Sequence, residues 1–249
     1  MKKLLFIGCL LLTVACQPTE STLAPSPTPI SATQTPPATA TVTPEPTLTP
    51  TPVPPTPLLR FFTEEFDGTL PAWSILQSSG ESSPQTSVEN GTLVFTLPSR
   101  YDWAYTIIGA EEYSDARIDA SLDNRSTSPS SLGLICRYSE SNGWYEFNIS
   151  EDGTYTVLFG QWLSAGVAEY QPIASDASEY IHRDGAENQI GLDCQGNTLW
   201  LYLNGKLFRK LDVTRFGLTE GKLGLAVASF QNAPIIAGFN WVKVGQSGE

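Results

Sequence analysis

Carboxylate side chains are the first residues of this chain whose spacing would allow catalysis. Asp119 and Asp123 share one predicted strand face, and Glu146 lies on another predicted strand between two aromatic residues. Hydrolysis of a glycosidic bond needs two carboxyl groups about 5–10 Å apart that flank the same bond. Asp119 and Glu146 would satisfy this condition only on neighbouring strands with both side chains pointing outward. We therefore interpret them as solvated charges on sheet faces and do not expect an enzyme; a hydrolase is the rival hypothesis.

Cysteines are the second chemically distinctive group, and Cys136 and Cys194 are the two that fall in the folded part of the chain. In an oxidising compartment such a pair predicts a disulfide, and the alternative is two buried free thiols. Because the bond would close a long loop, it would stabilise the fold by roughly 4 kcal/mol through the entropy of the unfolded chain. Two cysteines and the single histidine, His182, supply too few ligands for a zinc site.

The N-terminus determines the compartment that we expect. Lys2 and Lys3 precede an apolar run, Leu4–Val14, that is too short to span a bilayer. The run leads through Ala15 to Cys16, and this junction resembles the lipobox of bacterial lipoproteins, except that a threonine stands where leucine is usual. We therefore predict that residues 1–15 are a signal peptide, that Cys16 receives lipid, and that the protein is extracytoplasmic and anchored to the membrane. The alternatives are an ordinary signal peptide and a cytosolic protein with an apolar start.

Residues 16–58 comprise the lipidated cysteine and a stalk of low complexity. Residues 17–58 contain 13 prolines and 12 threonines, with no aromatic and no basic residue. Such a segment buries too little apolar surface to offset its chain entropy, so we expect it to be disordered or in extended polyproline II. At about 3.1 Å per residue it would reach on the order of 100 Å. We interpret it as a tether that holds the folded domain, residues 59–249, away from the membrane.

The charge of the chain excludes one class of partner. The formal net charge is -12, and lysine and arginine form no cluster. Because a phosphate backbone attracts clustered basic side chains, we expect no nucleic-acid partner. We interpret the acidic balance as a source of solubility, and we expect a monomer.

Many short strands separated by turns predict the fold class. The stretch 187–205 holds two alternating apolar runs joined at 195–197, and a second turn follows at Asn204-Gly205. Residues 116–123 alternate apolar and polar side chains with a period of two. The segment 162–180 is looser, and only 175–181 shows a short helical period. Turns about every 8–12 residues indicate an all-β fold, a two-sheet antiparallel jelly-roll sandwich.

Several segments carry a resemblance to a known superfamily. They are EEFDG at 64–68, GLICRY at 133–138, NGWYEFNISEDGTYTV at 142–157, the stretch 187–205, GKLGLAVASF at 221–230 and IIAGFNWVKV at 235–244. In this order they resemble the concanavalin A-like lectin/glucanase superfamily, in its laminin-G-like group. The resemblance covers Phe61–Val244 and implies a jelly roll, a fold that hosts lectins, binding modules, hydrolases and spacers.

The resemblance implies two catalytic patterns with which this chain can be compared. Glucanases of the superfamily carry glutamate-x-aspartate-x-x-glutamate on one strand, and no segment here matches it. The 3-keto-disaccharide hydrolase-like branch carries glycine-x-x-x-arginine, and Gly133 to Arg137 is similar to it. The other acidic and histidine-bearing segments of that branch are not recognisable here. The mismatch favours a binding module over a catalyst.

Binding modules of this fold stack aromatic rings on sugars and fix hydroxyl groups with polar side chains. Strand alternation places some candidate ligand-binding residues on an exposed face and others at its rim: Arg137, Trp144, Glu146, Asn148, Trp103 and Trp162. The partner would be an extracellular glycan, or else a surface protein. Many relatives bind calcium near the joined termini, so Asp67 would be the ligand of a structural calcium ion, although Asn240 stands where a second aspartate often lies. We expect no other cofactor.

Overall fold

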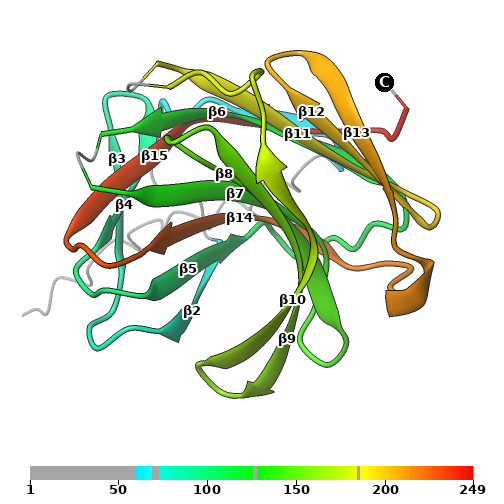
Figure 1. Ribbon diagram of the computed structural model, residues 1–249, viewed down its shortest axis with the longest axis horizontal. Coiled ribbons are helices and arrows are strands. Elements are labelled where there is room, and N and C mark those ends of the chain that lie inside the picture. Colours follow the sequence, from blue (N-terminus) through cyan, green and yellow to red (C-terminus); the bar gives the residue numbers. More distant parts are fainter. Residues whose placement is uncertain (1–59, 69–72, 126–127, 184–185, 249) are drawn as a thin grey trace, which may run out of the picture. The chain divides into compact units, whose positions relative to one another are not determined.

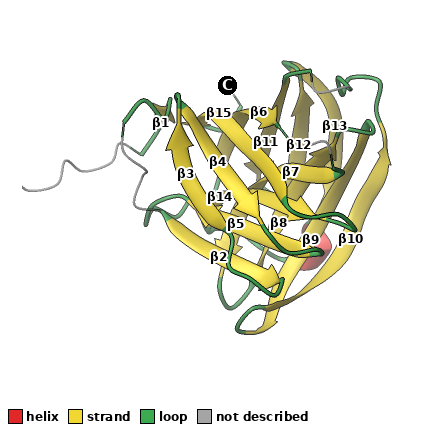
Figure 2. Ribbon diagram, turned by 90° about the vertical axis from the view of Figure 1, so that its left-hand side faces the viewer, coloured by secondary structure: helices red, strands yellow, loops and turns green. Residues whose placement is uncertain are grey.

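A computed structural model describes residues 60–68, 73–125, 128–183 and 186–248. The predicted signal peptide, Cys16 and the stalk lie outside the described residues, so these assignments stay predictions. Strands make up most of the described ranges, and a short 3-10 helix, η1 (Thr214–Phe216), is drawn in red in Figure 2. In the same ranges, no helix has the length and the apolar character needed to cross a membrane.

Two antiparallel sheets account for the strands of the described residues (Figure 1). The eight-stranded sheet has the order β13 (Lys206–Asp212), β12 (Thr198–Leu203), β11 (Asn188–Gln195), β6 (Ala116–Asn124), β15 (Ile235–Gly245), β4 (Thr92–Leu97) and β3 (Gln85–Glu89), with β1 (Phe62–Glu64) also paired to β15. The seven-stranded sheet has the order β10 (Val167–Ala177), β9 (Thr154–Ser164), β8 (Gly143–Ser150), β7 (Ser130–Ser139), β14 (Lys222–Ser229), β5 (Asp102–Ile107) and β2 (Ser74–Ser79). The predicted all-β sandwich is confirmed.

The core between the sheets follows from the alternation in the sequence. On β12, Leu199, Leu201 and Leu203 are fully buried in this core, while the intervening aromatic side chains lie on the opposite face of the strand. The predicted disulfide is confirmed, since Cys136 on β7 bonds to Cys194 on β11 and thereby joins the two sheets, with 6.6 Å between the Cα atoms.

An asparagine-glycine turn sets the register of the hairpin formed by β12 and β13. Asn204 and Gly205 have φ of 49° and 76°, and the flanking residues Leu203 and Lys206 are paired. Positive φ at both central positions is what a two-residue hairpin turn needs, and asparagine and glycine tolerate it best. This turn is confirmed where the sequence predicted it.

The segment 162–180 differs from its prediction. It lies in a long hairpin of β9 and β10, and residues 175–177 continue β10 rather than starting a helix. Pro172 obscured this strand in the sequence because proline removes a ladder donor. The structure accommodates it because β10 is the edge strand of its sheet and has a register shift between Pro172 and Ala174.

The seven-stranded sheet curls until its two edge strands meet. The amide of Ser79 on β2 donates to the carbonyl of Gly166 in the β9–β10 turn at 3.1 Å, and the amide of Ala168 donates to Oγ of Ser78 at 3.2 Å. β2 and the β9–β10 turn both lie on the lower side of the molecule in Figure 1. We call the sheet face that the curl encloses, which points away from the eight-stranded sheet, the concave face.

Candidate functional site

One half of the concave face is filled by aromatic side chains. The buried Trp144 has the rings of Tyr105, Tyr138 and Trp162 around it, at centroid distances of 5.5, 5.7 and 5.2 Å. We call the whole set the aromatic cluster; its members are Leu76, Trp103, Tyr105, Ile107, Ile135, Tyr138, Trp144, Trp162, Ala168, Tyr170 and Ala226. The contact between β2 and the β9–β10 turn closes this half of the face.

The other half of the concave face is open and forms a groove of about 670 Å³. Its lining comes from β5, β7, β8, β9 and the adjoining loops: Trp103, Pro129, Ser130, Ser131, Asn148, Ser150, Glu151, Asp152, Thr154, Thr156, Leu158 and Phe230. Trp103 and Phe230 supply half-buried rings, and hydroxyl, amide and carboxyl groups supply the polar part. A concave site with a few polar groups beside aromatic rings is the usual form of a small-molecule site.

Gly133 on β7 leaves room for the central polar side chain of the groove. It pairs with Asn148 on β8, which pairs in turn with Thr156 on β9. A Cβ atom at position 133 would overlap the carboxamide oxygen of Asn148. The absence of a side chain at 133 therefore lets this amide lie flat against the sheet at the floor of the groove.

Glu146 lies between the aromatic cluster and the groove, and it is 1% exposed. Nε1 of Trp144 donates to its Oε2 at 3.0 Å, and Nδ2 of Asn148 donates to its Oε1 at 2.7 Å. Burial raises the pKa of this carboxyl, and the hydrogen bonds from Trp144, Asn148 and Tyr105 lower it by a smaller amount. Within the described residues, no ion pair to Glu146 is found.

Two tyrosines extend this polar network to the edge of the sheet. The hydroxyl groups of Tyr105 and Tyr170 are 2.5 Å apart. Burial, followed by the nearby Glu146 charge, raises the pKa of Tyr170 to about 12, so its hydroxyl stays protonated at physiological pH. The network thus links the buried carboxyl to β10, the strand that closes the filled half.

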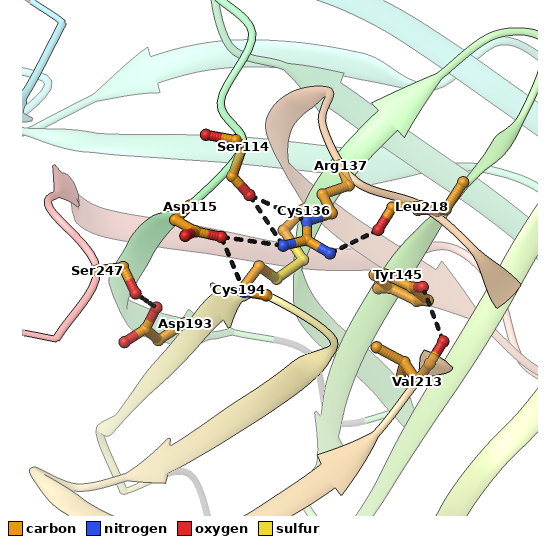
Figure 3. Close-up of a disulfide and its surroundings, with 11 residues drawn as sticks. Ser114, Asp115, Cys136, Arg137, Tyr145, Asp193, Cys194, Val213, Leu218 and Ser247 are labelled. Carbon is orange, nitrogen blue, oxygen red and sulfur yellow. Dashed lines mark hydrogen bonds and ion pairs between the residues drawn. A yellow bond between two sulfur atoms is a disulfide. The ribbon is translucent and has the colours of Figure 1, made fainter. Parts of the chain in front are cut away.

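Arg137 is buried, so the prediction that it lies on an exposed face is wrong, and its role in ligand binding stays a prediction. It is 2% exposed and has φ of 53° where the β7–β8 register shifts. Its guanidinium donates to the carbonyl oxygens of Ser114 and Leu218, at 2.9 and 2.5 Å, and is 3.2 Å from an Asp115 carboxylate oxygen, beside the disulfide (Figure 3). The hydrogen bonds from this guanidinium attach the loops that contain Ser114 and Leu218 to β7.

The other predicted residues divide between the two halves of the concave face. Trp144 and Glu146 do point away from the core between the sheets, but the prediction that they are exposed is wrong because the aromatic cluster covers them. Trp103 and Asn148 line the groove, and their role in binding stays a prediction. Trp162 lies in the cluster and donates to the hydroxyl of Tyr138 at 3.1 Å, outside the groove lining.

Sequence reasoning missed the residues that β9 brings to the groove. Thr154 and Thr156 alternate with Tyr155 and Val157, which are buried in the core between the sheets. This alternation was a signal available in the sequence, and it indicates a second polar row beside Asn148.

Asp119 and Glu146 do not form the pair of carboxylates that the rival hydrolase hypothesis would need. Asp119 lies on β6 of the eight-stranded sheet, where Nη2 of Arg117 binds its Oδ1 at 2.8 Å, while Glu146 faces the concave side of the other sheet. Asp67 is exposed, and no group of three or more histidine, cysteine, aspartate or glutamate side chains suited to a metal occurs among the described residues. A calcium ion at Asp67 stays a prediction.

Comparison with known proteins gives a likeness of fold. No protein-family model and no curated protein matches the chain. A solved structure of a protein of unknown function with a galectin-like fold from Bacillus subtilis is 13% identical, covering 74% of this chain and 94% of that one, with a TM-score of 0.54. A GH16 protein of a mixed linkage glucan locus from Bacteroides ovatus is 12% identical, covering 74% of this chain and 99% of that one, with a TM-score of 0.52. The carbohydrate binding module CBM66 from Bacillus subtilis is 14% identical, covering 69% of this chain and 95% of that one, with a TM-score of 0.50. These likenesses confirm the predicted jelly-roll sandwich fold.

Proposed function

We propose that the folded domain is a non-catalytic carbohydrate-binding module that takes an extracellular glycan into the groove. The observation that carries this proposal is the open half of the concave face, where half-buried rings adjoin a row of hydroxyl and amide groups. An aromatic ring offers a flat apolar surface to the C–H face of a sugar, and the polar row offers partners to its hydroxyl groups. Two of the similar folds described above, a GH16 protein and a carbohydrate binding module, support this class of ligand.

The arrangement of carboxylates favours binding over hydrolysis. Among the described lining residues, the carboxylates of the groove are Glu151 and Asp152, which are neighbours in one turn. Asp152 Oδ1 accepts from the amide and the hydroxyl of Thr154, at 2.9 and 2.6 Å, so it holds the turn at the start of β9. Glu146 is covered by the cluster. A glycosidase instead needs two accessible carboxyls on opposite sides of one bond.

The proposal includes a location for the module. Lipid on Cys16 would anchor the chain to the outside of a bacterial membrane, and the proline- and threonine-rich stalk would hold the domain at a distance from it. The sequence of residues 1–58 supports this part of the proposal. Metabolic labelling with a lipid analogue, in the chain and in Cys16→Ser, would test it, and equal labelling of the two would contradict it.

Glycan binding is tested with the mature chain from residue 16, made soluble by Cys16→Ser, on a panel of polysaccharides with calcium and with a chelator. We expect binding that Trp103→Ala weakens at least tenfold, because Trp103 is an aromatic wall of the groove. Trp241→Ala is the matched control, since Trp241 lies on β15 of the other sheet and does not line the groove. Absence of binding to every glycan, or equal binding by the two variants, would overturn the proposal. Binding lost on chelation would support the calcium ion at Asp67.

A further inference from the structure

The charged side chains in the described lining of the groove are acidic. Among the residues that the structure describes, its lining contains two carboxylates and no lysine, arginine or histidine. Arg183 lies near the same turn, but its guanidinium packs against Gly153, which is not part of the lining. A ligand with carboxylate, sulfate or phosphate groups would therefore lose hydration on entry and would meet charges of its own sign.

The orientation of Asn148 adds to this polarity. An amide side chain can present either its NH₂ group or its oxygen, and the hydrogen-bond network decides which. Here the nitrogen is 2.7 Å from Oε1 of Glu146, and the oxygen lies over Gly133 at the floor of the groove. Because a carboxylate oxygen accepts hydrogen bonds, Glu146 turns the NH₂ group inward and leaves the amide oxygen toward the groove.

The second oxygen of Glu146 is also committed as an acceptor. An indole N–H is only a donor, so the contact of Trp144 Nε1 with Oε2 at 3.0 Å requires that oxygen to accept. Trp144 is itself fixed by the aromatic cluster, so the carboxyl has little freedom to rotate. The fixed indole thus orients the carboxyl, and the carboxyl in turn orients the amide.

We propose that Glu146 is a positioning residue that fixes Asn148 as an acceptor, so that the groove selects glycans that donate hydrogen bonds, neutral or amine-bearing, and rejects anionic ones. The inference rests on the proposed function and deepens it, since it names the chemical class of glycan. Hydroxyl and ammonium groups donate to the amide oxygen of Asn148. Acidic glycans find no cationic partner among the described residues of its lining.

The ligand class is tested with laminarin, mixed-linkage β-glucan and dextran, each in neutral and carboxymethylated form, and with chitosan oligomers. We expect at least one neutral glycan or the chitosan oligomers to bind, and carboxymethylation to weaken binding at least tenfold. Binding of a carboxymethylated glycan as tight as that of its neutral parent, and abolished by Trp103→Ala, would overturn this inference and leave the proposed function intact. Absence of binding in every arm would overturn both.

The role of Glu146 is tested with Glu146→Gln, and Glu112→Gln is the matched control because it removes one exposed charge away from the groove. A glutamine can donate its NH₂ group to the Asn148 oxygen and let the amide rotate. We expect the discrimination against carboxymethylated glycans to fall at least threefold in Glu146→Gln and to be unchanged in Glu112→Gln. Unchanged discrimination in a folded Glu146→Gln protein would overturn the positioning role.

A second variant keeps the test decisive if Glu146→Gln does not fold. Asn148→Ala removes the amide oxygen while leaving the residues that line the groove around it, and we expect it to weaken binding of the neutral glycan at least tenfold. In addition, the side-chain amide protons of Asn148 should exchange slowly with solvent in the wild-type protein, because one of them is bonded to a buried carboxyl. Unaltered affinity in Asn148→Ala, or rapid exchange of both protons, would overturn the inference.

Discussion

The two halves of the concave face share strands but differ in what fills them. On β8 and β9, Trp144 and Gly160 belong to the closed half, and Asn148 and Thr156 belong to the open half. In the closed half, large rings on five strands, β5, β7, β8, β9 and β10, occupy the space that the curl encloses. In the open half, Gly133 and Ala228 keep the floor low on β7 and β14. One curled sheet thus produces both a second core and a groove, depending on the size of its side chains.

Removing the largest ring of the closed half should have the largest effect. Trp144 is fully buried, so Trp144→Ala would leave a cavity and cost about 3–5 kcal/mol of unfolding free energy. Chemical denaturation measures this cost, with Phe230→Ala as the comparison from the open half, because Phe230 lines the groove and lies outside the aromatic cluster. A cost below about 1 kcal/mol for Trp144→Ala would mean that the closed half is not a core.

Filling the floor of the open half should weaken glycan binding while costing less unfolding free energy than the removal of the Trp144 ring. In Gly133→Ala the new methyl group would overlap the amide oxygen of Asn148, and we expect a cost of about 1–3 kcal/mol. Glycan affinity should fall as well, because the amide has to leave its position. Ala228 on the neighbouring strand β14 pairs with Ser131 of the groove lining, so Ala228→Gly is the control for a change of size at the floor, and it should retain binding. Undiminished binding by Gly133→Ala would contradict the position of Asn148 described above.

The carboxyl between the two halves should make stability depend on pH. Burial raises the pKa of Glu146 above its usual value near 4.5, so the folded chain holds this proton more tightly than the unfolded chain does. The contribution of this group to the unfolding free energy should therefore be largest below pH 4.5. It should fall as pH rises through the raised pKa, by up to about 1.4 kcal/mol per pH unit. Denaturation of wild type and Glu146→Gln across pH isolates the effect, and parallel curves for the two proteins would contradict it.

The contact that closes the sheet should have the smallest effect of the four. Oγ of the buried Ser78 accepts from the amide of Ala168, and Ser78→Ala should cost about 1 kcal/mol and let water reach the cluster. Tryptophan fluorescence should shift to the red, since three tryptophans belong to the cluster. Ser164→Ala, an exposed position of the same hairpin, is the control and should show neither change.

The sequence predicts those structural features that depend on residues close to one another along the chain. Alternation places Leu199, Leu201 and Leu203 in the core, and it also gives the correct face for Trp144. It does not reveal that Trp144 is covered, because the cover depends on a contact between Ser78 and Ala168, which are 90 positions apart. The same limit explains Arg137, whose partners lie on loops far from it in sequence.

The meeting of β2 with the β9–β10 turn also bears on how these domains can crowd together. Edge strands usually present unpaired amide and carbonyl groups to which a strand of another molecule can add. In the seven-stranded sheet the two edges approach each other, and the amide of Ser79 is already bonded to the carbonyl of Gly166. The amide of Ser79 and the carbonyl of Gly166 are thus not available to a strand of another copy, so the curl that shapes the groove also protects these two edge groups from intermolecular pairing.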